Sequence, residues 1–159
     1  MIDIPKLMAL CEAEVGYTEG ANNDTKFGKW CGLNHQPWCA MSASKMFYDA
    51  GMIRTVAAKT KPKGYASCAE WLNYLTKNGQ LVPIGEAKAG DLLFYQLNED
   101  SLPDHVEICK GNNKALKFVK AYGGNTSDGR GSVSNGDGYY LRKRGYANIM
   151  AVARPKEIA

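Results

Sequence analysis

One cysteine stands where a helix is expected to begin, and its position suggests nucleophilic chemistry. Cys39 lies in the segment QPWCA at 36–40, where the proline fixes φ and suits the first turn of a helix. Free N–H groups and the positive end of the helix dipole stabilise a thiolate at such a position. The alternative interpretation is a buried structural cysteine, which suits Cys11, Cys68 and Cys109 well.

A nucleophilic thiol needs a base, and the sequence offers two histidines, His35 and His105. His105 begins the predicted strand HVEIC at 105–109, so we expect it at the rim of a sheet, facing the start of a helix packed on that sheet. His35 comes only four residues before Cys39, in a predicted loop that does not fix its ring. We therefore favour His105 as the base over His35. The other interpretation of His105 is an ordinary surface histidine.

A third residue could orient the imidazole. Asn125 lies in GGNTS at 123–127, after the next predicted strand. Its side-chain carbonyl can accept a hydrogen bond from one ring nitrogen and leave the other facing the thiol, as in Cys-His-Asn arrangements. The plain alternative is a turn asparagine, which is common in such stretches. The order of a cysteine at a helix start, then a histidine and an asparagine at successive strand ends, favours cysteine-dependent catalysis.

The elements that must position these residues follow from apolar periodicity and from Gly and Asn breaks. We expect helices over residues 4–15, 37–50 and 66–77, and a Gly- and Asn-rich loop over 16–37. Strands are expected over 91–97, 105–109, 116–122, 139–144 and 149–152. Helices followed by strands indicate an α+β fold, with N-terminal helices packed on a mostly antiparallel sheet of about five to six strands. Meander connections are the simplest topology.

Composition is that of one ordinary globular domain of 159 residues, and the net charge of +4 is too small to argue for nucleic acid. The charge is uneven, because residues 110–159 carry 10 basic and 3 acidic groups. That excess favours an anionic surface as a partner, or is simply a solvated basic face. Five cysteines are an odd number, which excludes a complete internal disulfide framework. We find no membrane span and no signal peptide, which predicts synthesis in a cytoplasm.

Six segments carry a family resemblance: NDTKFGKW at 23–30, QPWCAM at 36–41, AGDLLFY at 89–95, DHVEI at 104–108, GGNTS at 123–127 and NGDGYYLRKR at 135–144. Together they resemble the CHAP domain (cysteine, histidine-dependent amidohydrolase/peptidase) of bacteriophage endolysins, a papain-like family related to NlpC-type wall peptidases. The DHVEI segment is similar to the family's HVGI strand. The resemblance covers nearly the whole chain and implies a single CHAP catalytic domain over 1–159, without a separate cell-wall-binding domain.

The resemblance implies that Cys39 is the nucleophile, His105 the base and Asn125 the orienting amide. Many CHAP domains have a glutamate two residues before the asparagine, where this sequence has Gly123. If that glutamate normally orients the histidine, its role falls here to Asn125 alone or to another residue. The implied reaction is acyl transfer from an amide of peptidoglycan, with the Cys39 backbone N–H as the first oxyanion donor. Gln36 is a candidate for the second donor, and its other interpretation is an ordinary turn residue.

Further expectations concern the substrate, the partners and metals. Four aromatic residues could wall the substrate groove, although aromatic side chains more often form core: Trp38, Trp30, Phe27 and Tyr122. No cofactor and no structural calcium are expected, because only Asp24 lies in the loop where some CHAP domains bind that ion. The implied function is an endolysin-like peptidoglycan hydrolase, an amidase or endopeptidase, that acts on the wall after release from the host cytoplasm. We expect a monomer whose partner is peptidoglycan, with anionic wall polymers as a candidate second partner and with neither nucleic acid nor membrane.

Two other functions fit the same sequence. A non-catalytic wall-binding module on a degenerate papain-like fold is favoured by the missing glutamate at Gly123, but the Cys39, His105 and Asn125 set argues against it. A papain-like transferase or deamidase acting on a protein would share the Cys–His pair and be indifferent to peptidoglycan. Rapid alkylation of one thiol near neutral pH would distinguish an active nucleophile from a binding module.

Overall fold

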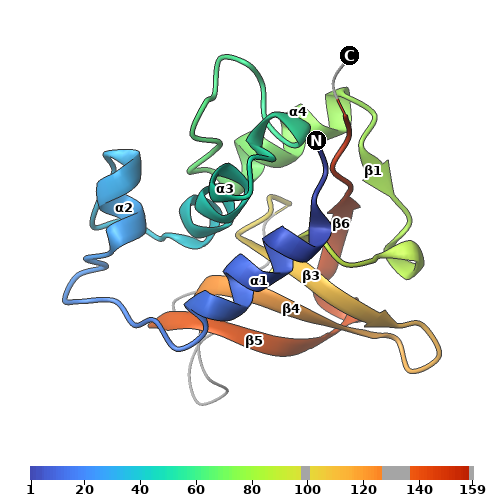
Figure 1. The fold of residues 1–159 in the computed structure, drawn as a ribbon. Helices are drawn as coiled ribbons and strands as arrows, with labels where there is room; N and C mark the ends of the chain where they lie inside the picture. Colours follow the sequence, from blue (N-terminus) through green and yellow to red (C-terminus); the bar gives the residue numbers. More distant parts are fainter. Residues whose placement is uncertain (98–100, 127–136, 158–159) are drawn as a thin grey trace.

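Helices and a sheet form two layers in the computed structural model, which describes residues 1–97, 101–126 and 137–157 (Figure 1). The helices of the described residues are α1 (Ile4–Glu14), α2 (Lys26–Cys31), α3 (Cys39–Asp49) and α4 (Cys68–Lys77). The strands are β1 (Leu81–Val82), β2 (Leu92–Tyr95), β3 (His105–Asn113), β4 (Phe118–Thr126), β5 (Gly138–Gly145) and β6 (Ile149–Ala153). The predicted α+β class is confirmed.

The sheet is antiparallel throughout the described residues, with strand order β1-β6-β2-β3-β4-β5. Strands β2 to β5 form the predicted meander. The last strand departs from that prediction, because β6 returns to pair with β2 at the other side of the sheet instead of extending the meander beyond β5. The short strand β1, which the sequence analysis did not predict, then pairs with β6.

Helix α3 packs on β3 and β4, and α1 packs against α3, so these helices cover one face of the sheet (Figure 1). Alternation along β2 separates the two faces. Leu92 and Phe94 join the core beneath the helices, whereas Leu93 and Tyr95 join a second cluster of buried side chains. This packing brings the first residue of α3 against the starting end of β3, which is where the two predicted catalytic residues lie.

Local signals explain where the helices begin. Asp3 accepts from the backbone N–H of Lys6 at the start of α1, and Ser67 caps α4 by accepting from the N–H of Glu70. The predicted loop over 16–37 was wrong in part, because α2 forms inside it. Thr25 caps this helix, and Gly32 ends it in the left-handed conformation at φ 75°.

An ion pair between a buried carboxylate and a partly exposed arginine ties the end of the last strand to the start of β2. Asp91 is fully buried and accepts from Nε and Nη2 of Arg154 at 3.0 and 2.9 Å. The same carboxylate accepts from the backbone N–H of Lys88. The aspartate of the AGDLLFY segment therefore has a structural role, since it fixes the turn before β2 and holds the chain that follows β6.

Candidate active site

Cys39 is the first residue of α3, and its side chain is almost entirely buried. Trp38 precedes it as the helix N-cap and makes no side-chain capping bond, so the first N–H groups of α3 are not used by a cap. Trp38 is itself buried and stacks on Phe27 at 5.5 Å. Gly124 backs this arrangement, because a Cβ there would come within 2.5 Å of the Trp38 ring. The packing of Trp38 thus fixes the position of the neighbouring Cys39 at the start of α3.

His105 opens β3 and is 1% exposed. Its Nε2 lies 3.0 Å from Oε2 of Glu107, two residues along the same strand. Because Glu107 is ionised, Nε2 carries the proton and donates to the carboxylate. Nδ1 is buried and makes no hydrogen bond of ordinary geometry within the described residues. Nδ1 is therefore the ring nitrogen available to Cys39, whose proximity acts on the pKa of His105.

Glu107 is fully buried and is held by Arg144 of β5. The guanidinium donates from Nε to Oε1 at 3.0 Å and from Nη2 to Oε2 at 2.7 Å, a bidentate arrangement that fixes the plane of the carboxylate. Nη2 also donates to Oγ1 of Thr126 on β4 at 2.9 Å. Three strands thus contribute to one network that orients the imidazole.

The charges of this network reinforce one another. Burial disfavours a carboxylate, but His105 and Arg144 outweigh it and lower the pKa of Glu107 to about 2. Burial likewise opposes an imidazolium, but Cys39 and Glu107 outweigh it and raise the pKa of His105 to about 9. The opposite shift occurs at Cys39, whose pKa lies well below the ordinary 9.0. The site therefore favours a thiolate–imidazolium pair.

A second thiol touches the nucleophile candidate. The sulfur of Cys68, the first residue of α4, lies 3.7 Å from the sulfur of Cys39. A hydrogen bond from the Cys68 thiol is the largest cause that lowers the pKa of Cys39, burial opposes it, and His105 and the backbone N–H of Val106 add to it. The pKa of Cys68 is raised well above 9.0, first by this same hydrogen bond to Cys39 and then by burial. Sequence analysis assigned Cys68 to the structural cysteines and did not predict this contact.

The partner of the imidazole differs from the predicted one. The atom that meets Nε2 is a carboxylate oxygen of Glu107, not the amide of Asn125. Asn125 is buried in β4, with a left-handed φ of 53° next to an irregularity in the β4–β5 pairing. The proposed orienting role thus passes to Glu107, and a role for Asn125 stays a prediction. Ser127, at the end of the same motif, lies outside the described residues, as do Asn135 and Gly136 of the last motif.

His35 lies apart from this network. It is exposed, adopts φ 66°, and its Nδ1 lies 2.9 Å from the backbone carbonyl of Asn22. It is not among the groups that act on the pKa of Cys39. The structure therefore brings His105, and not His35, to the thiol.

Three of the four aromatic residues considered for the substrate groove are buried in the core. Trp38, Phe27 and Tyr122 are at most 2% exposed, so they form core and cannot wall an open groove. Their rings are buried because they fill the core between the helices and the sheet. Trp30 is partly exposed, but it packs edge-on against Tyr48 and under Lys45.

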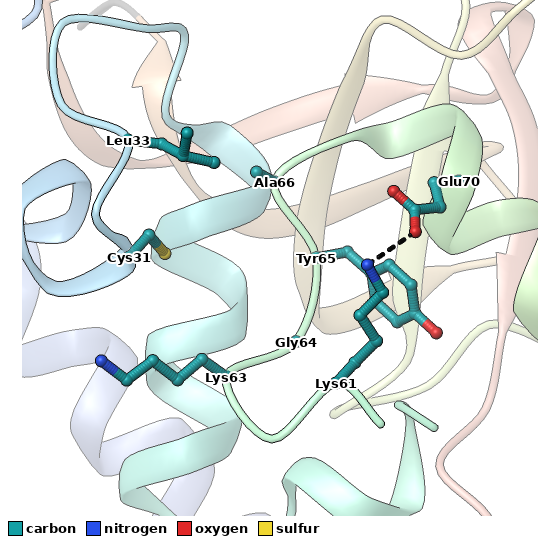
Figure 2. Close-up of a pocket in the computed structure, with 8 residues that line it drawn as sticks. All are labelled: Cys31, Leu33, Lys61, Lys63, Gly64, Tyr65, Ala66 and Glu70. Carbon is teal, nitrogen blue, oxygen red and sulfur yellow. Dashed lines mark ion pairs between the residues drawn. The ribbon is translucent and has the colours of Figure 1, made fainter. Parts of the chain in front are cut away.

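A pocket of about 450 Å³ does open beside the starts of α3 and α4. It is lined by Leu33, Gln36, Pro37, Met41, Ala66, Ser67 and Glu70. A smaller neighbouring pocket shares Leu33, Ala66 and Glu70 with it. Figure 2 shows the ion pair between Lys61 and Glu70 at one side of this smaller pocket, and the paired atoms are 2.9 Å apart. Gln36 is exposed at the rim of the larger pocket, so its role as an oxyanion donor stays a prediction. These pockets replace the aromatic residues as the candidate substrate surface.

Asp24 does not belong to an oxygen cage in the described chain. It is engaged by the Asn34 amide at 2.7 Å and by Lys29 at 3.4 Å, in an exposed turn. Over residues 1–97, 101–126 and 137–157, no group of three His, Cys, Asp or Glu side chains is arranged to hold a metal ion. Within the same ranges, no helix is both long and apolar enough to cross a membrane.

Solved structures that share the fold include the following three. They are the peptidoglycan hydrolase RipB from Mycobacterium tuberculosis (TM-score 0.54, 17% identity), Ly7917 (TM-score 0.57, 15% identity) and a lipoprotein-like NLP/P60-family protein from Staphylococcus aureus (TM-score 0.54, 12% identity). Each comparison covers 98% of this chain, and 65%, 63% and 42% of the respective neighbour. The chain thus spans less than two thirds of each neighbour's length. It has the papain-like α+β fold of the NlpC/P60 proteins.

Sequence comparison adds no closer assignment. No protein-family model matches this sequence, and no curated protein matches it significantly. The fold and the Cys39–His105–Glu107 geometry therefore carry the functional argument.

Proposed function

We propose that this protein is a cysteine-dependent peptidoglycan hydrolase of the CHAP type, which cleaves an amide bond of the wall peptide as an amidase or endopeptidase. The observation that carries the proposal is the thiol at the start of α3, paired with an imidazole that a buried, Arg144-clamped carboxylate orients. Two fold neighbours add support, because one is named as a peptidoglycan hydrolase and another as an NLP/P60-family protein.

Acylation follows from the geometry of the pair. The Cys39 thiolate attacks the amide carbonyl carbon, and the oxyanion is held by the backbone N–H of Cys39, with Gln36 as the second donor that we propose. His105 transfers its Nδ1 proton to the leaving amine, so the C–N bond breaks and an acyl-enzyme forms. Glu107 keeps the Nε2 proton in place during this step, because its own pKa is too low for it to accept that proton.

Deacylation uses the same groups, but His105 now accepts a proton instead of donating one. A water molecule gives its proton to Nδ1 of His105 while its oxygen attacks the thioester carbon. The tetrahedral intermediate then expels the Cys39 thiolate and releases a carboxylic acid. The pocket beside Gln36 and Ser67 is the surface on which we place the substrate peptide during both steps.

The wider setting of this activity also belongs to the proposal. A single catalytic domain over 1–159, action on the wall after release from a host cytoplasm, and an origin in phage lysis follow from the resemblance to endolysins. Weak attraction to anionic wall polymers is expected from the basic residues of 110–159. Several of these charges are already paired, with Glu12, Glu86, Glu107 and Asp91 as partners, which reduces the free excess. Wall sedimentation that does not weaken with added salt would exclude this attraction.

The test is mass spectrometry of purified Gram-positive peptidoglycan after incubation with the wild type, Cys39→Ala and Lys114→Ala. The last variant is the control, because Lys114 is an exposed residue that pairs with Glu86. The proposal expects fragments from the wild type and the control only. New amino termini would identify the bond that is cut.

Other outcomes of this experiment favour other functions. Wall binding without fragment release by the wild type and Cys39→Ala would support the binding module. Neither cleavage nor binding would favour a papain-like transferase or deamidase that acts on a protein. Fragment release by Cys39→Ala would contradict the assignment of the nucleophile.

A further inference from the structure

The two sulfurs at the starts of α3 and α4 form a close dithiol. Their separation of 3.7 Å is the one distance between cysteine sulfurs within hydrogen-bond range in the part of the chain that the structure describes. The two residues are 29 positions apart in sequence, so the tertiary fold creates this pair. Acylation needs one thiol only, so the hydrolase mechanism does not account for the second as a reacting group.

The positions of the two thiols suit thiol–disulfide exchange. Cys39 and Cys68 each occupy the first position of a helix. The first cause that raises the pKa of Cys68 is its hydrogen bond to Cys39, and this cause is removed once the Cys39 sulfur is part of a mixed disulfide. Closing a disulfide requires the sulfurs to approach by about 1.7 Å, to the roughly 2.05 Å of an S–S bond. The segment before α4 includes Gly64 at φ 75° and lines both pockets through Ala66, so the start of α4 borders open space.

We propose that Cys39 and Cys68 are a reversible disulfide site, which low-molecular-weight disulfides close and thiols reopen. In the first step the Cys39 thiolate attacks one sulfur of the small disulfide, forms a mixed disulfide and releases one small thiolate. In the second step Cys68 loses its proton to solvent and attacks the Cys39 sulfur, which expels the second small thiolate. Two protein thiols are oxidised to one disulfide, and one small disulfide is reduced to two thiols.

The remaining cysteines are poor competitors for this reaction. Burial raises the pKa of both Cys11 and Cys109 to about 12, and it also raises the pKa of Cys31. The pKa of Cys39 is shifted the other way, by the Cys68 thiol first and by His105 as well, against the effect of burial. The first attack should therefore occur at Cys39, and the nearest sulfur to resolve it is that of Cys68.

Closing this disulfide removes the nucleophile. This consequence rests on the proposed hydrolase function, whereas the thiol chemistry itself does not. The protein would be inactive where small disulfides prevail and would regain activity in a reducing compartment. The mechanism would also protect Cys39 from irreversible oxidation beyond the sulfenic state.

The test uses the full chain, reduced and then freed of reductant, and treated with oxidised glutathione near pH 7.5. Intact mass should fall by two hydrogen atoms, and peptide mapping should link Cys39 to Cys68. Peptidoglycan release should drop by more than about tenfold and return after dithiothreitol. Cys68→Ser should instead accumulate a glutathione adduct on Cys39, and Cys31→Ser, the matched control, should still lose two hydrogens. Each variant is compared with its own reduced form.

Several results would overturn the proposal. A glutathione adduct that persists on wild-type Cys39, a link between a different pair of cysteines, or no modification would each do so. If Cys68→Ser fails to fold, Cys68→Ala gives the same mass readout. Loss of two hydrogens from a protein whose reduced form releases no fragments supports the disulfide site and counts against the hydrolase function, so the two failures are distinguishable.

Discussion

Glu107 occupies the space that a side chain at Gly123 would need. A Cβ at Gly123 would come within 2.6 Å of Cγ and 2.7 Å of Oε2 of Glu107. The two residues lie on neighbouring antiparallel strands, one step beyond the paired residues Ile108 and Tyr122. The sequence resembles the CHAP pattern, which has a glycine in its HVGI strand and a glutamate two residues before its asparagine. Relative to that pattern, positions 107 and 123 carry the two residue types in exchanged places across the strand pair.

Replacing Glu107 with glutamine should weaken catalysis and change its pH dependence. The amide keeps the size of the side chain but removes the charge that helps to raise the pKa of His105 to about 9. Turnover should fall roughly 10- to 100-fold. Because an imidazolium with a lower pKa loses its proton at a lower pH, the alkaline limb of the activity profile should move down from about 9. The measurement is kcat/KM against pH.

The control for this variant is Glu86→Gln, which alters an exposed carboxylate paired with Lys114. The alkaline limb of its kcat/KM profile should lie at the same pH as that of the wild type. An unshifted limb in Glu107→Gln would show that Glu107 does not act on the charge of His105, and would leave it with a purely structural role.

The exchange between positions 107 and 123 predicts strong coupling between two substitutions. Gly123→Glu alone should destabilise the protein, because its Cβ collides with Glu107 and a second carboxylate enters a buried site. Glu107→Gly alone leaves Arg144 without its bidentate partner. In the double variant the carboxylate returns from the other strand, so both thermal stability and activity should exceed those of either single variant. Additive losses in this double-mutant cycle would refute the exchange.

Asp91→Asn should destabilise the fold without a specific effect on catalysis. The substitution removes the buried charge that Arg154 contacts through two nitrogens, which costs about 3 kcal/mol of unfolding free energy. Urea denaturation followed by circular dichroism measures this cost. Lys114→Ala, which breaks an exposed ion pair, should leave the midpoint nearly unchanged, and equal midpoints for all three proteins would exclude the structural role of Asp91.

Much of the fold could be predicted because apolar periodicity reports burial. The helices around Leu7, Met46 and Trp71 and the strands around Phe94 and Val119 bury these central residues, whereas Val15 and Leu116, at the edges of their predicted elements, are exposed. Helix α2 was missed because Gly and Asn dominate its surroundings, although Thr25 and Gly32 carry capping signals. The placement of β6 beside β2 could not be read from the sequence, because strand order depends on which edges the packed helices leave available.

The contact between Cys39 and His105 could be predicted from the sequence, whereas their further partners could not. Cys39 and His105 are the first residues of a helix and a strand, and the starts of such elements can be predicted from the sequence. Glu107 had a signal in the glutamate of DHVEI, where the CHAP pattern has glycine. Its buried carboxylate is stabilised by His105 and by Arg144, and the contact with Arg144 on β5 could not be predicted from the sequence. Cys68 had no such signal in the sequence, because its contact with Cys39 joins two helices through tertiary packing.

The central claim is that Cys39 is an ionised nucleophile paired with His105, and alkylation tests it most directly. The rate of iodoacetamide modification at each cysteine is followed by peptide mass spectrometry from pH 4 to 10 in wild type and His105→Ala. We expect Cys39 to react fastest and to approach its plateau well below pH 9, because its pKa is lowered. In His105→Ala the rise should move to higher pH. A wild-type Cys39 whose rate rises only near pH 9, or that is slower than another cysteine, would contradict the account.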